Sequence, residues 1–197
     1  MECKQIFAEL AQQSGGIVTA KAAQAHGISR AMLSKLYQAG DIERIAKGQY
    51  ILPDGLQDDL LSISHRSRRI ILSHETALYL HGLSDRTPFV HSITVPSGQL
   101  PSTALKKVCK VYFIKPELFE LGRTQLPSSG GNVVPVYDLE RTVCDLIRSR
   151  SRVGTETFSF AMKAYAASSK NDLNKLYAYA KELRVMSALR TYLEVLL

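Results

Sequence analysis

Cysteine is scarce in this sequence, and the three copies lie far apart at Cys3, Cys109 and Cys144. An odd number of widely spaced cysteines does not provide the framework of a disulfide-stabilised secreted domain. None has a Cys or His neighbour at the spacing of a tetrahedral zinc site. We therefore expect reduced thiols and no bound metal.

Long apolar runs are also missing. No stretch approaches the roughly 18 apolar residues that a membrane-spanning helix needs, and no cationic leader precedes an apolar segment at the amino terminus. We expect a soluble, cytoplasmic protein. With 197 residues and 45% hydrophobic content, the chain can bury a core and is expected to form two modest domains.

The sequence contains few motifs that are typical of a catalytic site. The Pro-Ser-Ser-Gly-Gly-Asn stretch at residues 127–132 lacks the glycine spacing and the following Lys-Ser or Lys-Thr of a phosphate-binding loop. His74 and His81 are seven residues apart, which is too far for one metal without further donors. A lone histidine is more typical of a surface or capping position.

The helix expected after Asp138 offers no better nucleophile or acid-base pair. Arg141 and Asp145 are four residues apart, which favours a simple ion pair on one helix face. Cys144 lies on an apolar face, where burial suppresses the thiolate. We expect no enzymatic activity and no cofactor.

Positive charge is the main compositional signal. The formal net charge is +7 and the pI is about 9.4, which favours a polyanionic partner because basic residues near phosphates release counterions. Residues 1–54 contain six basic and five acidic residues, whereas 99–135 contain five and two, and 136–197 contain ten and seven. The second domain is therefore also a candidate for nucleic-acid contact.

Residues Gly16 to Leu52 predict a helix-turn-helix followed by a short hairpin, the layout of a winged DNA-binding domain. Thr19 is the expected N-cap of the first helix, and Ser29 of the second. Gly27 supplies the turn between them because glycine tolerates positive φ, and Ile28 supplies an apolar anchor.

The second helix, Arg30 to Ala39, is expected to hold Leu33, Leu36 and Tyr37 inward and to end at Gly40. In the hairpin, Ile42, Ile45, Tyr50, Ile51 and Leu52 flank an Ala-Lys-Gly turn. The candidate DNA-binding residues are Lys21, Ser29, Arg30, Ser34, Lys35, Gln38, Arg44 and Lys47.

These residue types suit groove recognition. Arg30 or Lys35 can donate to guanine, Gln38 can pair with adenine, and Arg44 and Lys47 on the hairpin can meet phosphate. Two alternatives remain open: such residues also form ordinary solvated helix faces, and winged helices also serve as protein-binding modules.

A helix over Glu2 to Gln13, with Ile6, Phe7 and Leu10 at helical spacing, is expected to support the motif. The turn-rich Pro53-Asp54-Gly55 marks the expected boundary between domain 1–54 and domain 55–197.

The fold class expected is α+β: an N-terminal winged helix-turn-helix domain, then a larger domain with a small sheet and a C-terminal helical layer. Helices are expected over Leu56 to Arg69 and from Ser73 to Gly82. Three strands are expected at Phe89–Val95, Val108–Ile114 and Val133–Tyr137. The helical layer is marked by apolar positions at Leu139, Val143, Leu146, Ile147; Phe158, Met162, Tyr165; Leu173, Leu176, Tyr177, Ala180; and Met186, Leu189, Tyr192, Leu193, Leu196.

Basic residues outside the winged helix form a second group of candidates. The additional candidate phosphate contacts are Arg66, Arg68, Arg69, Lys106, Lys107 and Lys110. The arginines either meet phosphate or complement the carbonyls at the end of their own helix, and the lysines form either a binding strip or a solvated surface.

Three segments together resemble the AbiEi-type antitoxins of abortive-infection systems, which are type IV toxin-antitoxin systems. They are the winged helix with Gly-Ile-Val-Thr, Gly-Ile-Ser-Arg and Gly-Gln-Tyr-Ile-Leu, then Leu-Ser-His-Glu-Thr-Ala-Leu-Tyr-Leu-His-Gly-Leu-Ser, then Val-Tyr-Asp-Leu-Glu-Arg-Thr-Val-Cys-Asp-Leu-Ile. By position, the resemblance implies a DNA-reading helix from Ser29 to Ala39 and a wing centred on Lys47 and Gly48.

The resemblance further implies a bacterial phage-defence protein that represses its own promoter, at repeated or inverted double-stranded sites, and counters a toxin resembling a nucleotidyltransferase. In this type, antitoxin and toxin need not form a stable complex. Two other classes remain open from the residues alone: a protein-interaction module, and a nuclease or transferase with an unrecognised site.

Overall fold

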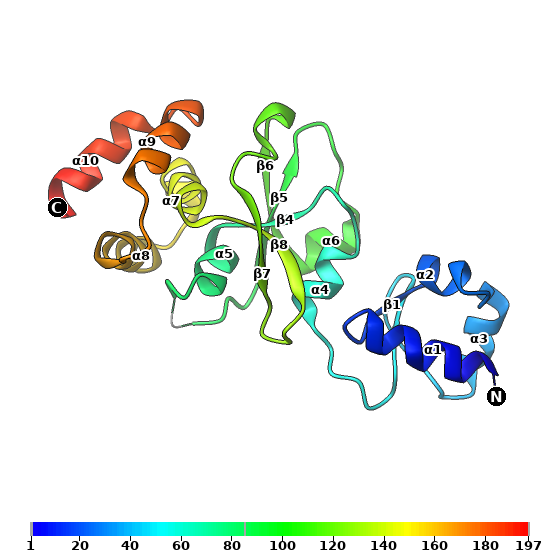
Figure 1. Ribbon diagram of the computed structural model, residues 1–197. Coiled ribbons are helices and arrows are strands. Elements are labelled where there is room, and N and C mark those ends of the chain that lie inside the picture. The colour runs from blue at the N-terminus through cyan, green and yellow to red at the C-terminus, as the bar shows by residue number, and fades with distance from the viewer. Residues whose placement is uncertain (1, 85, 197) are drawn as a thin grey trace. The chain divides into compact units, whose positions relative to one another are not determined.

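The computed structural model describes residues 2–84 and 86–196 (Figure 1). The chain divides into two compact units: residues 1–68 with 127–134, called here the N-terminal unit, and residues 69–126 with 135–197, called the C-terminal unit. Helices and strands occur in both, so the mixed α and β composition expected from the sequence is confirmed.

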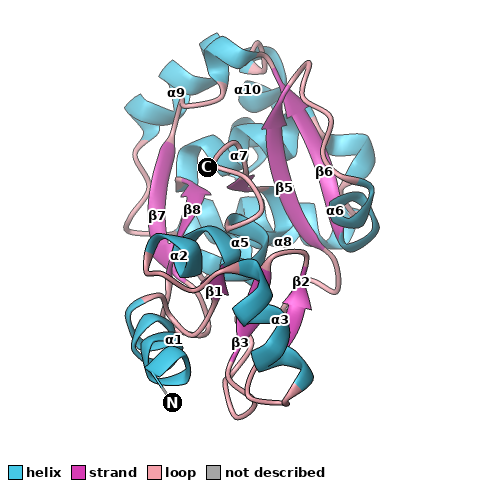
Figure 2. Cartoon of the chain, turned by 90° about the vertical axis from the view of Figure 1, so that its right-hand side faces the viewer, coloured by secondary structure: helices cyan, strands magenta, loops and turns pink. Residues whose placement is uncertain are grey.

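The N-terminal unit holds four helices and a three-stranded antiparallel sheet among its described residues. The helices are α1 (Glu2–Gln13), α2 (Ala20–Ala25), α3 (Arg30–Gln38) and α4 (Asp59–Ser64), and the strands are β1 (Val18–Thr19), β2 (Glu43–Ala46) and β3 (Gln49–Ile51). The strand order is β1-β3-β2. Figure 2 shows the first three helices together with these strands. The helix-turn-helix and wing lie where the sequence predicts them.

Local signals fix the helix-turn-helix. The Thr19 hydroxyl accepts a hydrogen bond from the Ala22 amide at 3.1 Å, and the Ser29 hydroxyl accepts one from Met32 at 3.2 Å. Gly27 has a φ of +83°, which a side chain would strain. Ile28 is fully buried. All four predictions are confirmed.

The prediction that Tyr37 faces inward on α3 was wrong. Leu33 is buried and Leu36 packs against the core, but the Tyr37 side chain is 51% exposed. Met32 packs inward instead. Met32, Leu33 and Leu36 lie within about 100° on the helix, whereas Tyr37 lies at the edge of this arc. The core-facing arc of α3 favours a fully apolar side chain such as Met32 over a tyrosine, whose hydroxyl must stay hydrated.

The N-terminal unit extends beyond the boundary expected at residue 54. The buried Gln49 amide donates to the Ser62 carbonyl at 2.9 Å, and the Ser62 hydroxyl donates back at 2.6 Å. The Asp58 carboxylate accepts hydrogen bonds from the Ser128 hydroxyl and, at 2.9 Å, from the Asn132 amide. Burial alone raises the pKa of Asp58, but these hydrogen bonds outweigh it and lower the pKa. Long-range polar contacts of this kind leave no local signal in the sequence.

The helix expected from residue 56 to 69 is shorter in the structure. α4 begins after Asp58, whose carboxylate accepts from the Leu60 and Leu61 amides, and ends at Ser64. The basic residues Arg66, Arg68 and Arg69 follow the helix rather than forming its last turn.

The C-terminal unit is built on a five-stranded sheet, not three strands. The strands are β4 (Ile71–Leu72), β5 (His91–Pro96), β6 (Cys109–Ile114), β7 (Arg123–Pro127) and β8 (Val133–Tyr137), in the order β6-β5-β4-β8-β7. β5 pairs parallel with β6 and antiparallel with β4, and β4 pairs parallel with β8. β4 is too short to show alternation, and β7 carries few apolar residues, so neither was expected.

The remaining helices confirm a C-terminal helical layer. They are α5 (His74–Leu80), α6 (Thr103–Val108), α7 (Leu139–Arg148), α8 (Thr155–Ala167), α9 (Leu173–Glu182) and α10 (Met186–Leu196), with the short 3₁₀ turns η1 (Pro116–Leu118) and η2 (Arg150–Arg152). Figure 1 shows α7 to α10 gathered on one side of this sheet. Leu173 and Tyr177, two of the apolar positions that marked this layer, are 38% and 40% exposed, because Leu176 and Ala180 form the buried stripe of α9.

The α7 core contains a buried ion pair. The Arg141 Nε donates to Asp145 at 3.0 Å, and both side chains are fully buried. The same guanidinium donates to the carbonyls of Leu118 and Leu121 and lies over the Tyr137 ring, 4.1 Å from its centroid. The predicted pairing is confirmed, and these carbonyls compensate for its burial.

Across the described residues, none of the helices combines the length and apolarity needed to cross a membrane.

Candidate nucleic-acid interface

The outward face of α3 gathers the polar residues predicted to read DNA. Arg30, Ser34, Lys35 and Gln38 are all exposed, and Lys21 on the preceding helix is exposed as well. Leu33 is buried beneath them, and Met32 and Leu36 pack against the same core. The helix is therefore held by its apolar side while its polar side faces outward.

The helix is fixed at both ends. At its amino end, Ser29 caps the first turn. At its carboxyl end, Gly40 has a φ of +75°, and its amide donates to the Tyr37 carbonyl. Lys4 forms a 2.7 Å ion pair with Asp41, which ties α1 to the segment after α3.

The wing is a tight hairpin with a basic tip. Gly48 adopts a φ of +70° in the turn between β2 and β3, and its carbonyl accepts from the Ala20 amide at 2.8 Å. This bond ties the turn to the start of α2. The neighbouring Lys47 is exposed at the tip. Arg44 on β2 is also exposed, and its Nε donates to the Ala46 carbonyl at 3.4 Å.

The cations of this face are not paired with a carboxylate of the residues that the structure describes. Within residues 2–84 and 86–196, Lys21, Arg30, Lys35 and Lys47 form no ion pair, in contrast to Lys4. Their charge therefore remains available to phosphate groups, the commonest contacts in protein–DNA interfaces.

Ser29 and Tyr37 differ from the other residues of this face. The Ser29 oxygen is engaged in capping α3, so its hydroxyl contributes first to helix geometry. Tyr37 was predicted to be buried, yet its half-exposed ring adds an aromatic surface to α3. Periodicity alone did not find it, because a tyrosine at the edge of an apolar stripe is compatible with either side.

The additional basic candidates are divided between the two units. Lys106 and Lys107 are exposed near the end of α6. Lys110, unlike these two lysines, forms a 2.9 Å ion pair with Glu75. Burial lowers the pKa of Lys110, but the hydrogen bonds and charges of Glu75 and Tyr112 together outweigh this effect and raise the pKa. Arg66 is half-buried, and Arg68 and Arg69 are exposed.

His74 is fully buried, which corrects the expectation of a surface or capping histidine. Its Nδ1 lies 3.0 Å from the Ser73 hydroxyl and its Nε2 lies 3.0 Å from the Ser149 hydroxyl, while the ring stacks on Tyr112 at 3.4 Å. Ser73 stands at the N-cap of α5 as predicted but makes no side-chain capping bond. Burial, reinforced by Arg148 and other nearby cations, lowers the pKa of His74 well below the usual histidine value.

The remaining catalytic candidates are dispersed. Cys144 is fully buried, and burial raises the pKa of its thiol to about 12, which confirms the predicted suppression of the thiolate. His81 is separately engaged, with Nε2 2.8 Å from the Tyr137 carbonyl. In the described part of the chain, no three His, Cys, Asp or Glu side chains are grouped as metal ligands would be.

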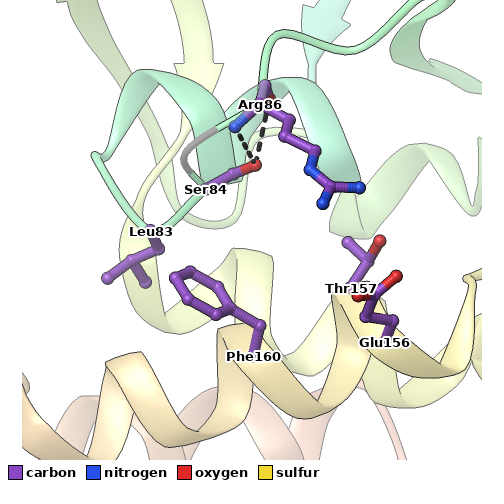
Figure 3. A pocket seen from close by; sticks show the side chains of 6 residues that line it. All are labelled: Leu83, Ser84, Arg86, Glu156, Thr157 and Phe160. Carbon is purple, nitrogen blue, oxygen red and sulfur yellow. Dashed lines mark hydrogen bonds between the residues drawn. The ribbon is translucent and has the colours of Figure 1, made fainter.

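A small hollow lies between the segment after α5 and the start of α8 (Figure 3). Its volume is about 120 Å³. Figure 3 shows Arg86 reaching toward Thr157 and Glu156, and Phe160 lying beneath Leu83. The space is below the roughly 300 Å³ at which ligand pockets begin, so we do not assign it a site.

The capped α3, its exposed polar face and the basic hairpin together define a winged helix-turn-helix module. Residues 5–53 match the family described as "Transcriptional regulator, AbiEi antitoxin". The resemblance to AbiEi-type antitoxins is therefore confirmed over this segment.

A comparison with solved structures finds a similar fold over most of the chain. The crystal structure of the RV2827C protein from Mycobacterium tuberculosis is similar with a TM-score of 0.65 and 14% sequence identity. The match covers 88% of this chain and 69% of that chain. At this identity the likeness concerns the fold alone. No curated protein matched the sequence.

Proposed function

We propose that the protein is a sequence-specific DNA-binding repressor of its own operon and an antitoxin that counters a nucleotidyltransferase-like toxin. The observation that carries the DNA-binding part is the α3 face, where Arg30 and Lys35 are exposed and unpaired within the described residues. The family match over residues 5–53 supports the regulatory part.

In this proposal α3 enters the major groove and the wing contacts the flanking backbone. Arg30 and Lys35 donate to guanine, Gln38 pairs with adenine, and Arg44 and Lys47 contact phosphate. One module of this size contacts few bases, so repeated or inverted sites supply the rest of the specificity. The protein acts without a catalytic site or a cofactor.

The double variant Arg30→Ala/Lys35→Ala tests DNA binding. We expect its affinity for promoter DNA in a mobility-shift assay to fall more than about tenfold, because each base contact contributes roughly 1–3 kcal/mol. Thermal unfolding should stay nearly unchanged, since both side chains are exposed.

The matched control is Lys163→Ala/Lys181→Ala, which removes the same charge from exposed positions on α8 and α9. The control should retain affinity. Unchanged affinity of the Arg30/Lys35 variant would remove these residues from the interface, and an equal loss in both variants would indicate attraction by net charge alone.

The antitoxin role has its own test. A nucleotidyltransferase-like gene adjacent to this one should arrest growth when expressed alone, and coexpression of this protein should restore growth. Rescue by the Arg30→Ala/Lys35→Ala variant would show that neutralisation does not require promoter binding. Failure of the wild-type protein to rescue would contradict the antitoxin role without affecting the DNA-binding role.

A further inference from the structure

A groove in the C-terminal unit lies where two parallel strands end. Its volume is about 380 Å³, and its lining includes Ser97 and Lys115. These residues directly follow β5 and β6, which pair in parallel along their whole length. We call this the strand-end groove. Its volume lies within the roughly 300–1,000 Å³ of ligand pockets, and the carboxyl ends of parallel strands are the usual place for ligands in open sheets.

One wall of the groove carries a positive charge that exceeds the negative charge of its carboxylate partner among the described residues. Arg148 Nη2 lies 3.2 Å from the Asp145 carboxylate, which also accepts from Arg141 Nε at 3.0 Å. Two guanidinium groups thus share one carboxylate and keep an excess positive charge even when Asp145 is ionised. Arg141 and Asp145 are fully buried, whereas 27% of the Arg148 side chain is exposed. The excess charge therefore reaches the groove through Arg148.

A second guanidinium is held at the groove by an unusual backbone. Arg184 follows α9 with a φ of +58°, and the Val185 amide donates to the Ala180 carbonyl at 2.9 Å. This is the helix-ending position at which glycine is preferred, because a side chain strains the left-handed conformation. The chain places an arginine there instead.

The rest of the lining is mixed. Phe113, Leu118 and Leu183 supply apolar surface, and the Phe113 side chain is 45% exposed. Two carboxylates are also present: Glu117 lies 3.9 Å from Lys115, and Glu182 lines the groove on α9. Together with the Arg141–Asp145–Arg148 group, four cations face three carboxylates, so the groove keeps a net positive charge.

We propose that the strand-end groove binds a small organic anion, a molecule with an apolar body and one carboxylate or phosphate group. The apolar body packs on Phe113 and Leu183, and the anionic group accepts hydrogen bonds from Arg148 and Arg184. Guanidinium groups suit this role because they bind carboxylate and phosphate in bidentate fashion. This proposal is independent of DNA binding by α3.

Four probes separate the contribution of the apolar body from that of the anionic group in the full-length protein. They are phenyl phosphate, benzoate, inorganic phosphate and uncharged benzyl alcohol. Backbone amide shifts followed by NMR should saturate with phenyl phosphate or benzoate and should centre on residues 97, 113–118 and 182–185. Inorganic phosphate should bind more weakly, because it lacks the apolar body, and benzyl alcohol more weakly still, because it lacks the charge. A preference between phenyl phosphate and benzoate identifies the anionic group.

The variant Arg184→Gly is the sharpest test, because glycine relieves the backbone strain while it removes the charge. We expect it to fold at least as stably as the wild type and to bind the anionic probes about tenfold more weakly, as expected for the loss of a charged hydrogen bond. Arg190→Gln on α10 is the matched control, since it removes one exposed charge outside the groove and should leave the affinity unchanged.

Three outcomes would overturn the proposal. The first is the absence of saturable shifts at these residues with every anionic probe. The second is equal affinity of the wild type and Arg184→Gly, which would assign Arg184 to the helix end alone. The third is saturable binding of a short DNA duplex at the groove with no effect of phenyl phosphate or benzoate.

Discussion

His74 occupies a conformation that few residues other than glycine adopt, with a φ of +49°. It is enclosed by Ser73, Ser149 and Tyr112, and both of its ring nitrogens have hydroxyl partners. The imidazole is neutral in the folded protein because burial and the surrounding cations oppose a further positive charge. A strained, buried histidine is therefore coupled to the stability of the C-terminal unit.

This coupling predicts acid sensitivity. The pKa of His74 is lowered in the folded state, so below about pH 6.5 the unfolded chain takes up a proton that the folded chain refuses. The contribution of neutral His74 to the free energy of unfolding is fully present above about pH 6.5. It is lost as the pH falls, at up to about 1.4 kcal/mol per pH unit. Urea unfolding at pH 7 and at pH 5.5 should show this loss.

The comparison variant is His74→Asn, because asparagine tolerates the left-handed conformation. We expect its stability to depend less steeply on pH than that of the wild type, whatever its absolute stability. The exposed His26→Asn variant serves as control and should keep the wild-type slope. An identical slope in all three proteins would show that His74 is not the group responsible.

Among the elements, those defined by neighbouring residues were the most predictable. Thr19 and Ser29 mark helix starts because their hydroxyls bond to amides only three residues away. The two-residue strand β4 is different, since it exists through its pairing with β5 and β8. No periodicity within Ile71 and Leu72 can reveal partners that lie far along the chain.

Two glycines in turns allow the cost of backbone strain to be separated from the cost of a steric clash. Gly27 and Gly122 both have positive φ, at +83° and +75°. A Cβ at Gly27 would meet no atom within 4 Å, whereas one at Gly122 would lie 2.6 Å from the Cβ of the buried Arg141. We expect Gly27→Ala to cost about 1–2 kcal/mol from the backbone alone. Gly122→Ala should cost roughly 1–3 kcal/mol more from overpacking.

Urea denaturation of both variants measures the difference. Gly27→Ala acts as the control, since it imposes the same backbone strain without the clash. Equal destabilisation of the two variants would mean that the Arg141 region yields to the added methyl group.

For the whole molecule, the net charge of +7 predicts a strong dependence of DNA affinity on salt. Lys47→Ala should weaken binding to all duplexes alike and reduce the slope of log affinity against log salt by about 1, as expected for the loss of one phosphate contact. Fluorescence anisotropy across a salt series measures this slope. Lys163→Ala should leave it unchanged, and a Lys47→Ala slope equal to that of the wild type would exclude a phosphate contact at the wing.

The outward face of α3 was more predictable than the surroundings of the basic residues elsewhere. The outward positions of Arg30, Lys35 and Gln38 follow from helical periodicity, because the apolar positions Leu33 and Leu36 decide which face is inward. Lys110 did not follow, since its partner Glu75 is 35 residues away in sequence. The charge of a basic residue is visible in a sequence, but its neutralisation by a distant carboxylate is not.

The N-terminal unit is discontinuous along the chain, because it includes residues 127–134. Asn132 donates from one amide group both to Asp58 and to the Gly15 carbonyl, at 2.9 and 3.2 Å. During synthesis, these partners emerge from the ribosome well before Asn132 does. The N-terminal unit can therefore acquire these hydrogen bonds only after Asn132 has been translated, so translation order delays the completion of the unit that contains the winged helix.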